Sequence, residues 1–338
     1  MKERISTLIK TLESKYSTSG DSSFMLSSSG LKRYELHPIE KTNFNTFSPY
    51  DAEKKFNTAA ADSGSLLIYE TPGWSIGYYK MSFRLFEICL KGKTCNTIQT
   101  RKAFKEDFVL IVNGEGTNKD NVMYKKPGKD AETALNEFRS QREVEFVLEH
   151  CKTLNKEDLL LLDGSLDHEN SKIIEKHPNV LGLSKKTGLS IAGHSAPSFF
   201  ALKATEHNVP EKPWFYHPLV KRSQADSTTN PEIIFGTLKP NSVVFRIDFP
   251  NSAKKDSIAQ KMKQLGVCSL DAKYRSYPYP LGAVHSDSVM RKNTKELVKR
   301  FIKRELNEYK AGSARDVFAL IEKDILHADW YDNLRRCS

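Results

Sequence analysis

Hydrophobic and polar residues follow two different periods along the chain, and these predict strands in some segments and helices in others. Strands are expected where short apolar or aromatic runs lie between turn-forming residues, namely 58–61, 73–90 (one long strand or a hairpin), 108–112, 159–162, 180–183, 189–192 and 243–249. Helices are expected where apolar residues recur every three to four positions, namely 1–15, 130–153 and most of 282–337. Several strands followed by a helix and a buried strand predict an α/β or α+β layer fold with a mixed sheet.

The polar segments between these elements predict how the chain is organised. Residues 17–30 are rich in serine and glycine, which is typical of a flexible linker. We therefore expect a short helix and linker over residues 1–30 and a globular domain over residues 31–338, which ends in helices. The region 205–232 contains four prolines and is expected to form loops. Residues 62–65, Asp-Ser-Gly-Ser, are expected to turn directly after the strand 58–61.

The charge of the chain indicates the class of its partners. The 338 residues include 52 Lys and Arg against 42 Asp and Glu, a formal net charge of +10. A basic excess favours polyanionic partners, nucleic acid first and anionic membranes second. The excess is strong in residues 291–310, where apolar residues at helical spacing predict a packed helix with a basic face that can bind phosphate groups.

Other features of the composition indicate the compartment. No apolar run in the sequence approaches the length of a membrane-spanning helix, and the N-terminus lacks the hydrophobic segment of a secretion signal. The five cysteines are scattered without CxxC spacing, which argues against a zinc site or a disulfide framework and is typical of a reducing compartment. We therefore expect a cytoplasmic protein that does not bind a membrane.

The run 159–165, Leu-Leu-Leu-Leu-Asp-Gly-Ser, places a carboxylate at the end of a predicted buried strand. Burying the charge of Asp163 costs free energy unless a cation or a hydrogen-bond donor compensates it. Gly164 allows the backbone to turn sharply at this point. Asp163 is therefore a candidate metal ligand or acid–base group, although an Asp-Gly pair is also a common turn.

Further carboxylates are predicted near the same edge of the sheet. Asp62 follows the strand 58–61, and the helix 130–153 carries three glutamates, Glu143, Glu145 and Glu149. Carboxylates this close repel one another, and they stay ionised together when a divalent cation neutralises them. One or two Mg²⁺ or Mn²⁺ ions held in this way are typical of phosphodiester hydrolysis. Which glutamate points inward is open, and we prefer Glu145 because it lies near the apolar stripe of the helix.

The segment 277–285, Tyr-Pro-Tyr-Pro-Leu-Gly-Ala-Val-His, predicts an extended entry into a helix that bears His285 in its first turns. A histidine at that position can ligate a metal ion or position a leaving group. A lone histidine is also common as a structural or surface residue.

Taken in order, these segments resemble the NurA family, nucleases that process DNA ends in archaea and some bacteria. The resemblance covers roughly residues 58–300. Its most specific parts are 163–166 (Asp-Gly-Ser-Leu) and 277–285 (Y-P-x-P-L-x-x-x-H), accompanied by 62–65, the glutamate-bearing helix and 184–187 (Ser-Lys-Lys-Thr). The chain departs from the family at Ser63, which interrupts the Asp-Gly-Ser that many members have there and weakens the match of Asp62.

The resemblance implies an RNase H-like mixed sheet flanked by helices, with helical extensions at the N-terminus and the C-terminus. It implies a deoxyribonuclease that depends on Mn²⁺, with Mg²⁺ as the alternative ion. Such an enzyme acts as an endonuclease on single-stranded DNA and as a 5′-to-3′ exonuclease on DNA ends, in end resection for double-strand break repair. The implied assembly is a homodimer that works with the hexameric HerA translocase ATPase.

The resemblance also implies roles for individual residues of this chain. The implied metal ligands are Asp62, Glu145 and Asp163, with His285 completing the site. The implied role of Tyr277 is to orient a scissile phosphate or a ligand, and that of Lys185 or Lys186 is to neutralise phosphate charge.

Two alternative functions stay open. Residues 193–197, Gly-His-Ser-Ala-Pro, approximate the G-x-S-x-G elbow of α/β-hydrolases, and Ser195 is followed by Asp248 and His285 in the order of a catalytic triad. Pro197 replaces the last glycine of that motif, which weakens this hypothesis. The second alternative is a non-catalytic DNA-binding or adaptor protein of the same fold, which the inserted Ser63 and the unassigned glutamate favour.

Overall fold

The structure of the chain, a computed structural model, describes residues 25–27, 33–116, 121–126, 128–155, 157–166, 170–185, 187–191, 194–220, 231–251, 253–274, 276–291, 293–310, 321, 323–326 and 328. The helix expected over 1–15 and most of the linker expected over 17–30 lie outside these residues. Within the expected linker, Met25–Ser27 forms a short strand, β1. The domain limits 1–30 and 31–338 stay predictions.

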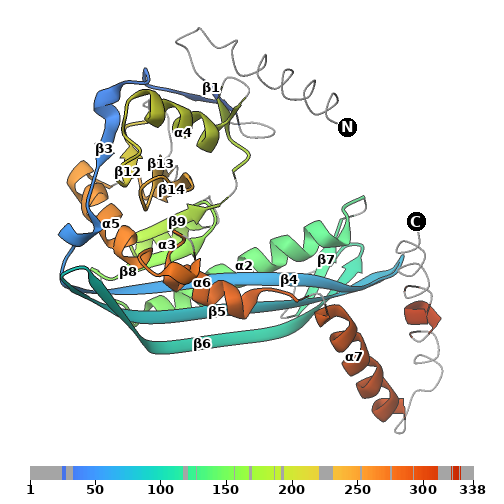
Figure 1. Cartoon of the computed structure of the whole chain (residues 1–338). Helices are drawn as coiled ribbons and strands as arrows, with labels where there is room; N and C mark the ends of the chain where they lie inside the picture. The colour runs from blue at the N-terminus through green and yellow to red at the C-terminus, as the bar shows by residue number, and fades with distance from the viewer. Residues whose placement is uncertain are drawn as a thin grey trace, which may run out of the picture. The chain divides into compact units, whose positions relative to one another are not determined.

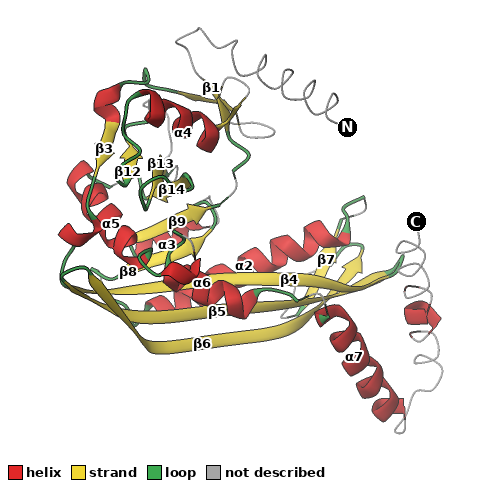
Figure 2. Cartoon of the chain, in the orientation of Figure 1, coloured by secondary structure: helices red, strands yellow, loops and turns green. Residues whose placement is uncertain are grey.

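Strands dominate the chain before helix α2, and strands and helices alternate after it (Figure 1, Figure 2). The strands are β1 (Met25–Ser27), β2 (Arg33–Glu35), β3 (Phe44–Thr46), β4 (Lys55–Glu70), β5 (Trp74–Lys91), β6 (Thr94–Asn113), β7 (Val122–Lys125), β8 (Leu159–Asp163), β9 (Val180–Ser184), β10 (Ser190–Ile191), β11 (His194–Ser195), β12 (Trp214–Tyr216), β13 (Glu232–Thr237) and β14 (Phe245–Phe249). The α-helices are α2 (Ala131–Cys151), α3 (Ser171–Lys176), α4 (Ala196–Glu206), α5 (Lys255–Cys268), α6 (Tyr279–Ser288) and α7 (Thr294–Lys310).

Among the described residues, ten strands form one mixed sheet in the order β3-β12-β13-β14-β9-β8-β4-β5-β6-β7. The pairs β8–β9 and β6–β7 are parallel, whereas β3–β12, β12–β13, β13–β14 and β14–β9 are antiparallel. A second sheet has the order β11-β10-β1-β2. This large mixed sheet flanked by helices confirms the α/β class predicted from the sequence (Figure 2). None of the described helices has the length and apolar character needed to cross a membrane.

The chain divides into two compact units, each assembled from three segments. The first unit consists of Met1–Ala60, Arg84–Arg101 and Thr153–Ala283. The second unit consists of Ala61–Phe83, Lys102–Lys152 and Val284–Ser338. Limits fall inside β4, β5, β6 and α6, so each of these elements contributes residues to both units.

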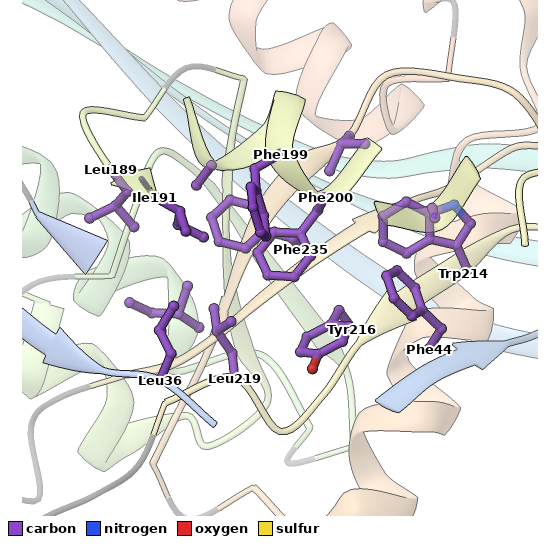
Figure 3. Close-up of a cluster of buried hydrophobic side chains, with 14 residues drawn as sticks. Leu36, Phe44, Leu189, Ile191, Phe199, Phe200, Trp214, Tyr216, Leu219 and Phe235 are labelled. Carbon is purple, nitrogen blue, oxygen red and sulfur yellow. The ribbon is translucent and has the colours of Figure 1, made fainter. Parts of the chain in front are cut away.

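An aromatic cluster contributed by β3, β12, β13 and α4 forms part of the core of the first unit (Figure 3). The ring of Phe44 lies edge-on to Trp214 and Tyr216, with centroid distances of 5.2 and 4.9 Å. Phe200 stacks on Phe235 at 5.0 Å. Aromatic pairs of this kind contribute about 0.5–1.5 kcal/mol each beyond the burial of their surface. Packing within the cluster therefore stabilises the short strands β3 and β12 in the sheet.

Helix α2 packs on strand residues of the second unit. Asp130 caps it by accepting a hydrogen bond from the backbone N–H of Thr133 at 2.7 Å. Phe138 lies edge-on to Tyr79 at 5.7 Å. Leu135 packs so closely on Gly77 that a Cβ at that glycine would lie 2.4 Å from its Cδ1. The helix predicted over 130–153 is thus confirmed as Ala131–Cys151.

The structure departs from the sequence prediction in several segments. Residues 62–65 continue β4, so the turn expected there is wrong. The region 205–232, expected to be loop, begins inside helix α4 and contains β12, whose three aromatic residues are buried between two neighbouring strands. Helices α4 and α5 were not predicted, and β6 begins well before residue 108. The strands expected at 159–162 and 180–183 are confirmed.

We expect Phe235→Ala to lower the free energy of unfolding by about 3–5 kcal/mol, because it removes a fully buried ring from the aromatic cluster. Phe301→Ala makes the same change at a ring of α7 that is 47% exposed, and we expect it to cost less than about 1 kcal/mol. Urea unfolding followed by circular dichroism measures both. Equal losses in the two variants would contradict the role assigned to the cluster.

Candidate functional site

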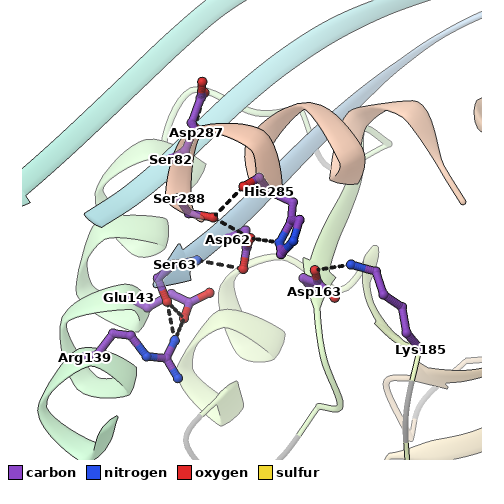
Figure 4. A network of polar contacts seen from close by, with 10 residues as sticks. All are labelled: Asp62, Ser63, Ser82, Arg139, Glu143, Asp163, Lys185, His285, Asp287 and Ser288. Carbon is purple, nitrogen blue, oxygen red and sulfur yellow. Dashed lines mark hydrogen bonds and ion pairs between the residues drawn. The ribbon is translucent and has the colours of Figure 1, made fainter. Parts of the chain in front are cut away.

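The carboxylate of Asp62 is buried within β4 and is surrounded by hydrogen-bonding groups. The residue is 8% exposed. Its Oδ1 accepts a hydrogen bond from the backbone N–H of Ser63 at 2.8 Å, and its Oδ2 accepts one from the Ser288 hydroxyl at 2.5 Å. The Nδ1 atom of His285 lies 2.9 Å from the same Oδ2 (Figure 4). These contacts compensate the hydration that the carboxylate loses on burial, and they tie the last turn of α6 to β4.

Gly64 allows the last turn of α6 to approach the backbone of β4. A Cβ at this position would lie 2.4 Å from the carbonyl oxygen of Ser288, which is too close for nonbonded atoms. The residue types at 62–65 are those of a turn, but the glycine serves this close contact and the strand continues through it. The glycine at position 64 therefore reflects close packing of α6 on β4 at the candidate site, and not a turn.

Asp287 holds the same turn of α6 on the neighbouring strands of the second unit. Its Oδ2 accepts a hydrogen bond from the Ser82 hydroxyl of β5 at 2.8 Å. Its Oδ1 lies 3.2 Å from the Lys102 ammonium of β6. With these contacts on one side and Asp62 on the other, the position of His285 is set by three strands.

Glu143 is the helix carboxylate that lies beside Asp62. The Ser63 hydroxyl donates a hydrogen bond to Glu143 Oε2, and Ser63 directly follows Asp62 in β4 (Figure 4). The Arg139 guanidinium, one turn earlier on α2, lies 3.0 Å from the same Oε2 and also bonds the Ser63 hydroxyl. The serine that interrupts the family pattern thus connects the helix carboxylate to the strand.

Glu145, the glutamate preferred from the sequence, points elsewhere. Its side chain is 63% exposed and pairs with Arg142 at 2.8 Å. Two residues on a helix are separated by about 200° of rotation, so Glu143 and Glu145 face nearly opposite directions. The structure therefore does not bring Glu145 to Asp62, and the glutamate of α2 that lies beside Asp62 is Glu143. The spacing of arginine and glutamate along the helix does not distinguish the two, because Arg142 and Glu145 also have a pairing distance, i,i+3.

Asp163 ends the buried strand β8, as the sequence predicts. It lies level with Leu183 of the parallel strand β9, and Gly164 follows with a φ of +127°, a conformation that favours glycine. The Lys185 ammonium lies 3.1 Å from Asp163 Oδ2 (Figure 4). The same ammonium lies 4.1 Å from the centroid of the Tyr277 ring. The Lys185 ammonium thus forms an ion pair with Asp163 and a cation–π contact with the Tyr277 ring.

The turn after Asp163 is held by Asp248 and Arg246, two residues whose pairing was not predicted from the sequence. The backbone N–H of Leu166 donates to Asp248 Oδ2 at 3.0 Å, and Asp248 is fully buried. Arg246 compensates that buried charge with two hydrogen bonds, at 2.7 and 2.8 Å. A Cβ at Gly182 would lie 2.7 Å from the Gly164 carbonyl oxygen. The turn therefore lies directly against β9 and is held by a paired carboxylate.

The remaining predicted residues lie as follows. Tyr277 is buried, and its ring supports Lys185. Lys186 lies outside the described residues. Ser195 caps α4, where its hydroxyl bonds the Ser198 hydroxyl at 2.7 Å. Asp248 accepts hydrogen bonds from Arg246 and Leu166, and the carboxylate that His285 Nδ1 contacts is that of Asp62, not Asp248 as the hydrolase triad requires. The hydrolase hypothesis is therefore not supported.

The donors predicted from the sequence suit a divalent cation. Asp62 and Asp163 supply carboxylates, which are ligands of Mg²⁺ and Mn²⁺, and His285 supplies an imidazole, which is a ligand of transition-metal ions. A histidine whose Nδ1 contacts a carboxylate also has its ring orientation fixed, as in many metal sites. The residues present therefore fit such an ion.

No protein-family model matches the sequence, and a search of curated proteins gives no match. Among solved structures, the NurA nuclease from Sulfolobus solfataricus matches with a TM-score of 0.56 and 17% identity, covering 93% of this chain and 96% of that chain. Endonuclease V from Ciona intestinalis, in complex with a 24mer DNA that contains an inosine, matches with a TM-score of 0.37 and 13% identity, covering 75% and 91%. The first comparison shows that the chain has a NurA-like fold.

We expect Gly182→Ala to weaken Mn²⁺ binding about tenfold, because the added methyl group displaces the turn that carries Asp163. Gly236→Ala is the matched control, since its Cβ would lie 2.5 Å from the Trp214 carbonyl oxygen, within the aromatic region. Both variants should lose about 1–3 kcal/mol of unfolding free energy. Titration calorimetry with Mn²⁺ should separate them, and unchanged affinity in Gly182→Ala would be the contrary result.

Proposed function

We propose that this protein is a metal-dependent DNA nuclease in which Asp62, Asp163 and His285 hold a catalytic divalent cation. The observation that carries the proposal is the buried Asp62 carboxylate, which is held by Ser288 and His285 on a fold shared with a NurA nuclease. These contacts fix the orientation of a carboxylate, which is the oxygen ligand that divalent cations such as Mg²⁺ and Mn²⁺ bind.

The strand order supports the inclusion of Asp163. β4 and β8 are neighbours in the sheet. In the first unit, Asn57 of β4 donates a hydrogen bond at 3.1 Å to Asp158, which directly precedes β8. Asp62 and Asp163 each follow this pair by five residues (57 to 62 and 158 to 163). We assign the two carboxylates at this equal offset on neighbouring strands to one ion.

Each residue has a distinct role in the proposed reaction. A bound divalent cation lowers the pKa of water and neutralises charge on the scissile phosphate. Lys185 places an ammonium beside Asp163, where it can contact a phosphate oxygen, and the Tyr277 ring fixes its position. Lys186 is assigned to the same phosphate charge from the sequence alone. Glu143, held by Ser63 and Arg139, replaces Glu145 as the helix carboxylate of the site.

The finer assignment rests on the resemblance of 163–166 and 277–285 to the NurA family. On that basis the enzyme uses Mn²⁺, with Mg²⁺ as the alternative, and acts as a single-strand endonuclease and a 5′-to-3′ exonuclease. Its place is DNA end resection in double-strand break repair, in the cytoplasm, as a homodimer that works with a HerA-type ATPase.

A second candidate is a non-catalytic DNA-binding protein of the same fold. One observation favours it: the Glu143 carboxylate is already paired with the Arg139 guanidinium, so a cation of the chain neutralises it. In this alternative the site residues stabilise the fold, and DNA binds without being cut.

We expect the purified protein to degrade single-stranded DNA in Mn²⁺ and to stop when EDTA removes the ion. Asp163→Asn keeps the size and the hydrogen-bond acceptor of the side chain but removes its charge, and it should lower the rate at least about a hundredfold. Glu143→Gln should also lower the rate, whereas Glu145→Gln, at an exposed position on the same helix, should leave it within about twofold.

Circular dichroism and thermal melting of each variant serve as controls for folding. Cleavage that persists in EDTA, or full activity in Asp163→Asn, would refute the metal mechanism. DNA binding by the wild type without cleavage in Mn²⁺ or Mg²⁺ would favour the non-catalytic alternative.

A further inference from the structure

A cavity of about 530 Å³ opens in the first unit next to Lys185. Its walls come from three parts of that unit: the segment after β9, the start of α4, and the loop before β14. Thr187, Ser198 and Ser242 contribute hydroxyl groups, and Val243 contributes an apolar surface that is 59% exposed. The volume falls in the range of about 300–1,000 Å³ that is usual for small-molecule sites.

The charge of the cavity selects the chemical class of its ligand. Lys185 is the one charged side chain among the described residues that line it. The hydroxyls of Thr187 and Ser198 accept hydrogen bonds, from the Leu189 N–H and the Ser195 hydroxyl, so their own protons can be donated to an anion without adding negative charge. The Ser242 hydroxyl instead donates to the Lys239 carbonyl oxygen at 2.8 Å. A cavity with one cation, several hydroxyls and no lining carboxylate among these residues favours an anion that bears several acceptor oxygens.

The start of α4 is not itself the anion site. The backbone N–H of Ala196 donates to the Leu189 carbonyl oxygen at 3.0 Å, and that of Ser198 donates to the Ser195 hydroxyl at 3.4 Å. Pro197 has no N–H. Recognition therefore depends on the side chains of the cavity, and above all on Lys185.

Lys185 connects this cavity to the candidate active site. Its ammonium lies 3.1 Å from Asp163 Oδ2 and 4.1 Å from the Tyr277 ring centroid, and the side chain also forms part of the cavity wall. A molecule in the cavity can therefore contact Lys185, which itself contacts Asp163, a carboxylate of the proposed nuclease site.

We propose that the cavity binds the nucleotide next to the scissile phosphodiester, with its phosphate toward Lys185 and the hydroxyl groups. This inference rests on the proposed nuclease function. The sugar lies against Val243 and Ala201, which offer apolar surface. The hydroxyls and the lysine contact the backbone of the strand, so binding here is independent of base sequence.

A charge series at Val243 tests the subsite, because this exposed side chain lines the cavity and has no part in the catalytic machinery. The probe is a short fluorescein-labelled oligothymidylate, and fluorescence anisotropy in EDTA measures its Kd without cleavage. We take the neutral Val243→Gln as the reference for charge, and relative to it we expect Val243→Glu to raise the Kd about fivefold and Val243→Lys to lower it by a similar factor.

Ile98→Glu serves as the control for net charge. Ile98 is 48% exposed on β6, which is five positions from β14 in the strand order, and we expect its substitution to leave the Kd within about twofold. Equal Kd values across the Val243 series, or an equal effect of Ile98→Glu, would overturn the subsite. The same proteins are then assayed for cleavage in Mn²⁺. If the Kd changes with charge at position 243 but the wild type does not cleave DNA, the subsite is retained and the nuclease function is refuted. If the wild type cleaves DNA but the Kd does not change with this charge, the nuclease function is retained and the subsite is refuted.

Discussion

The site depends on the cost of burying a carboxylate inside a β-sheet. Asp62 lies in β4 with little exposure, and the strand offers it one backbone N–H. The other compensating groups come from the last turn of α6, through Ser288 and His285. Gly64 is required for that turn to lie close enough to the strand. A single buried charge thus accounts for the glycine in the strand, the placement of the helix end and the orientation of the histidine.

The second carboxylate is controlled by a different constraint. Asp163 ends β8, and the chain then turns directly against Gly182 of β9. The buried carboxylate of Asp248 accepts a hydrogen bond from the backbone N–H of Leu166 in this turn, and Arg246 neutralises its charge. Removal of either partner would leave a buried charge or an unpaired donor, which costs more than the net value of the bond. These contacts hold the turn that follows Asp163, while the Lys185 side chain that pairs with Asp163 is itself 41% exposed.

Much of this arrangement was predictable, and the failures have physical causes. The leucine run at 159–162 and the periodic helix at 130–153 are strong local signals, and both are confirmed. The residues at 62–65 have the composition of a turn, but Gly64 is needed for close packing against Ser288 of α6. Ser288 lies more than two hundred residues away in the sequence, so local sequence patterns do not predict this contact. Glu143 and Glu145 differ by two positions on α2, and the choice between them depends on pairing with Arg139 and with β4.

The central claim is that Asp62 and Asp163 bind one ion together. A crystal structure of the protein soaked in Mn²⁺, with an anomalous difference map at the manganese edge, tests this claim directly. The account predicts one strong peak within bonding distance of both carboxylates, with the His285 imidazole beside it. A map without a peak at these residues, or with an ion bonded to one of the two carboxylates alone, would contradict it.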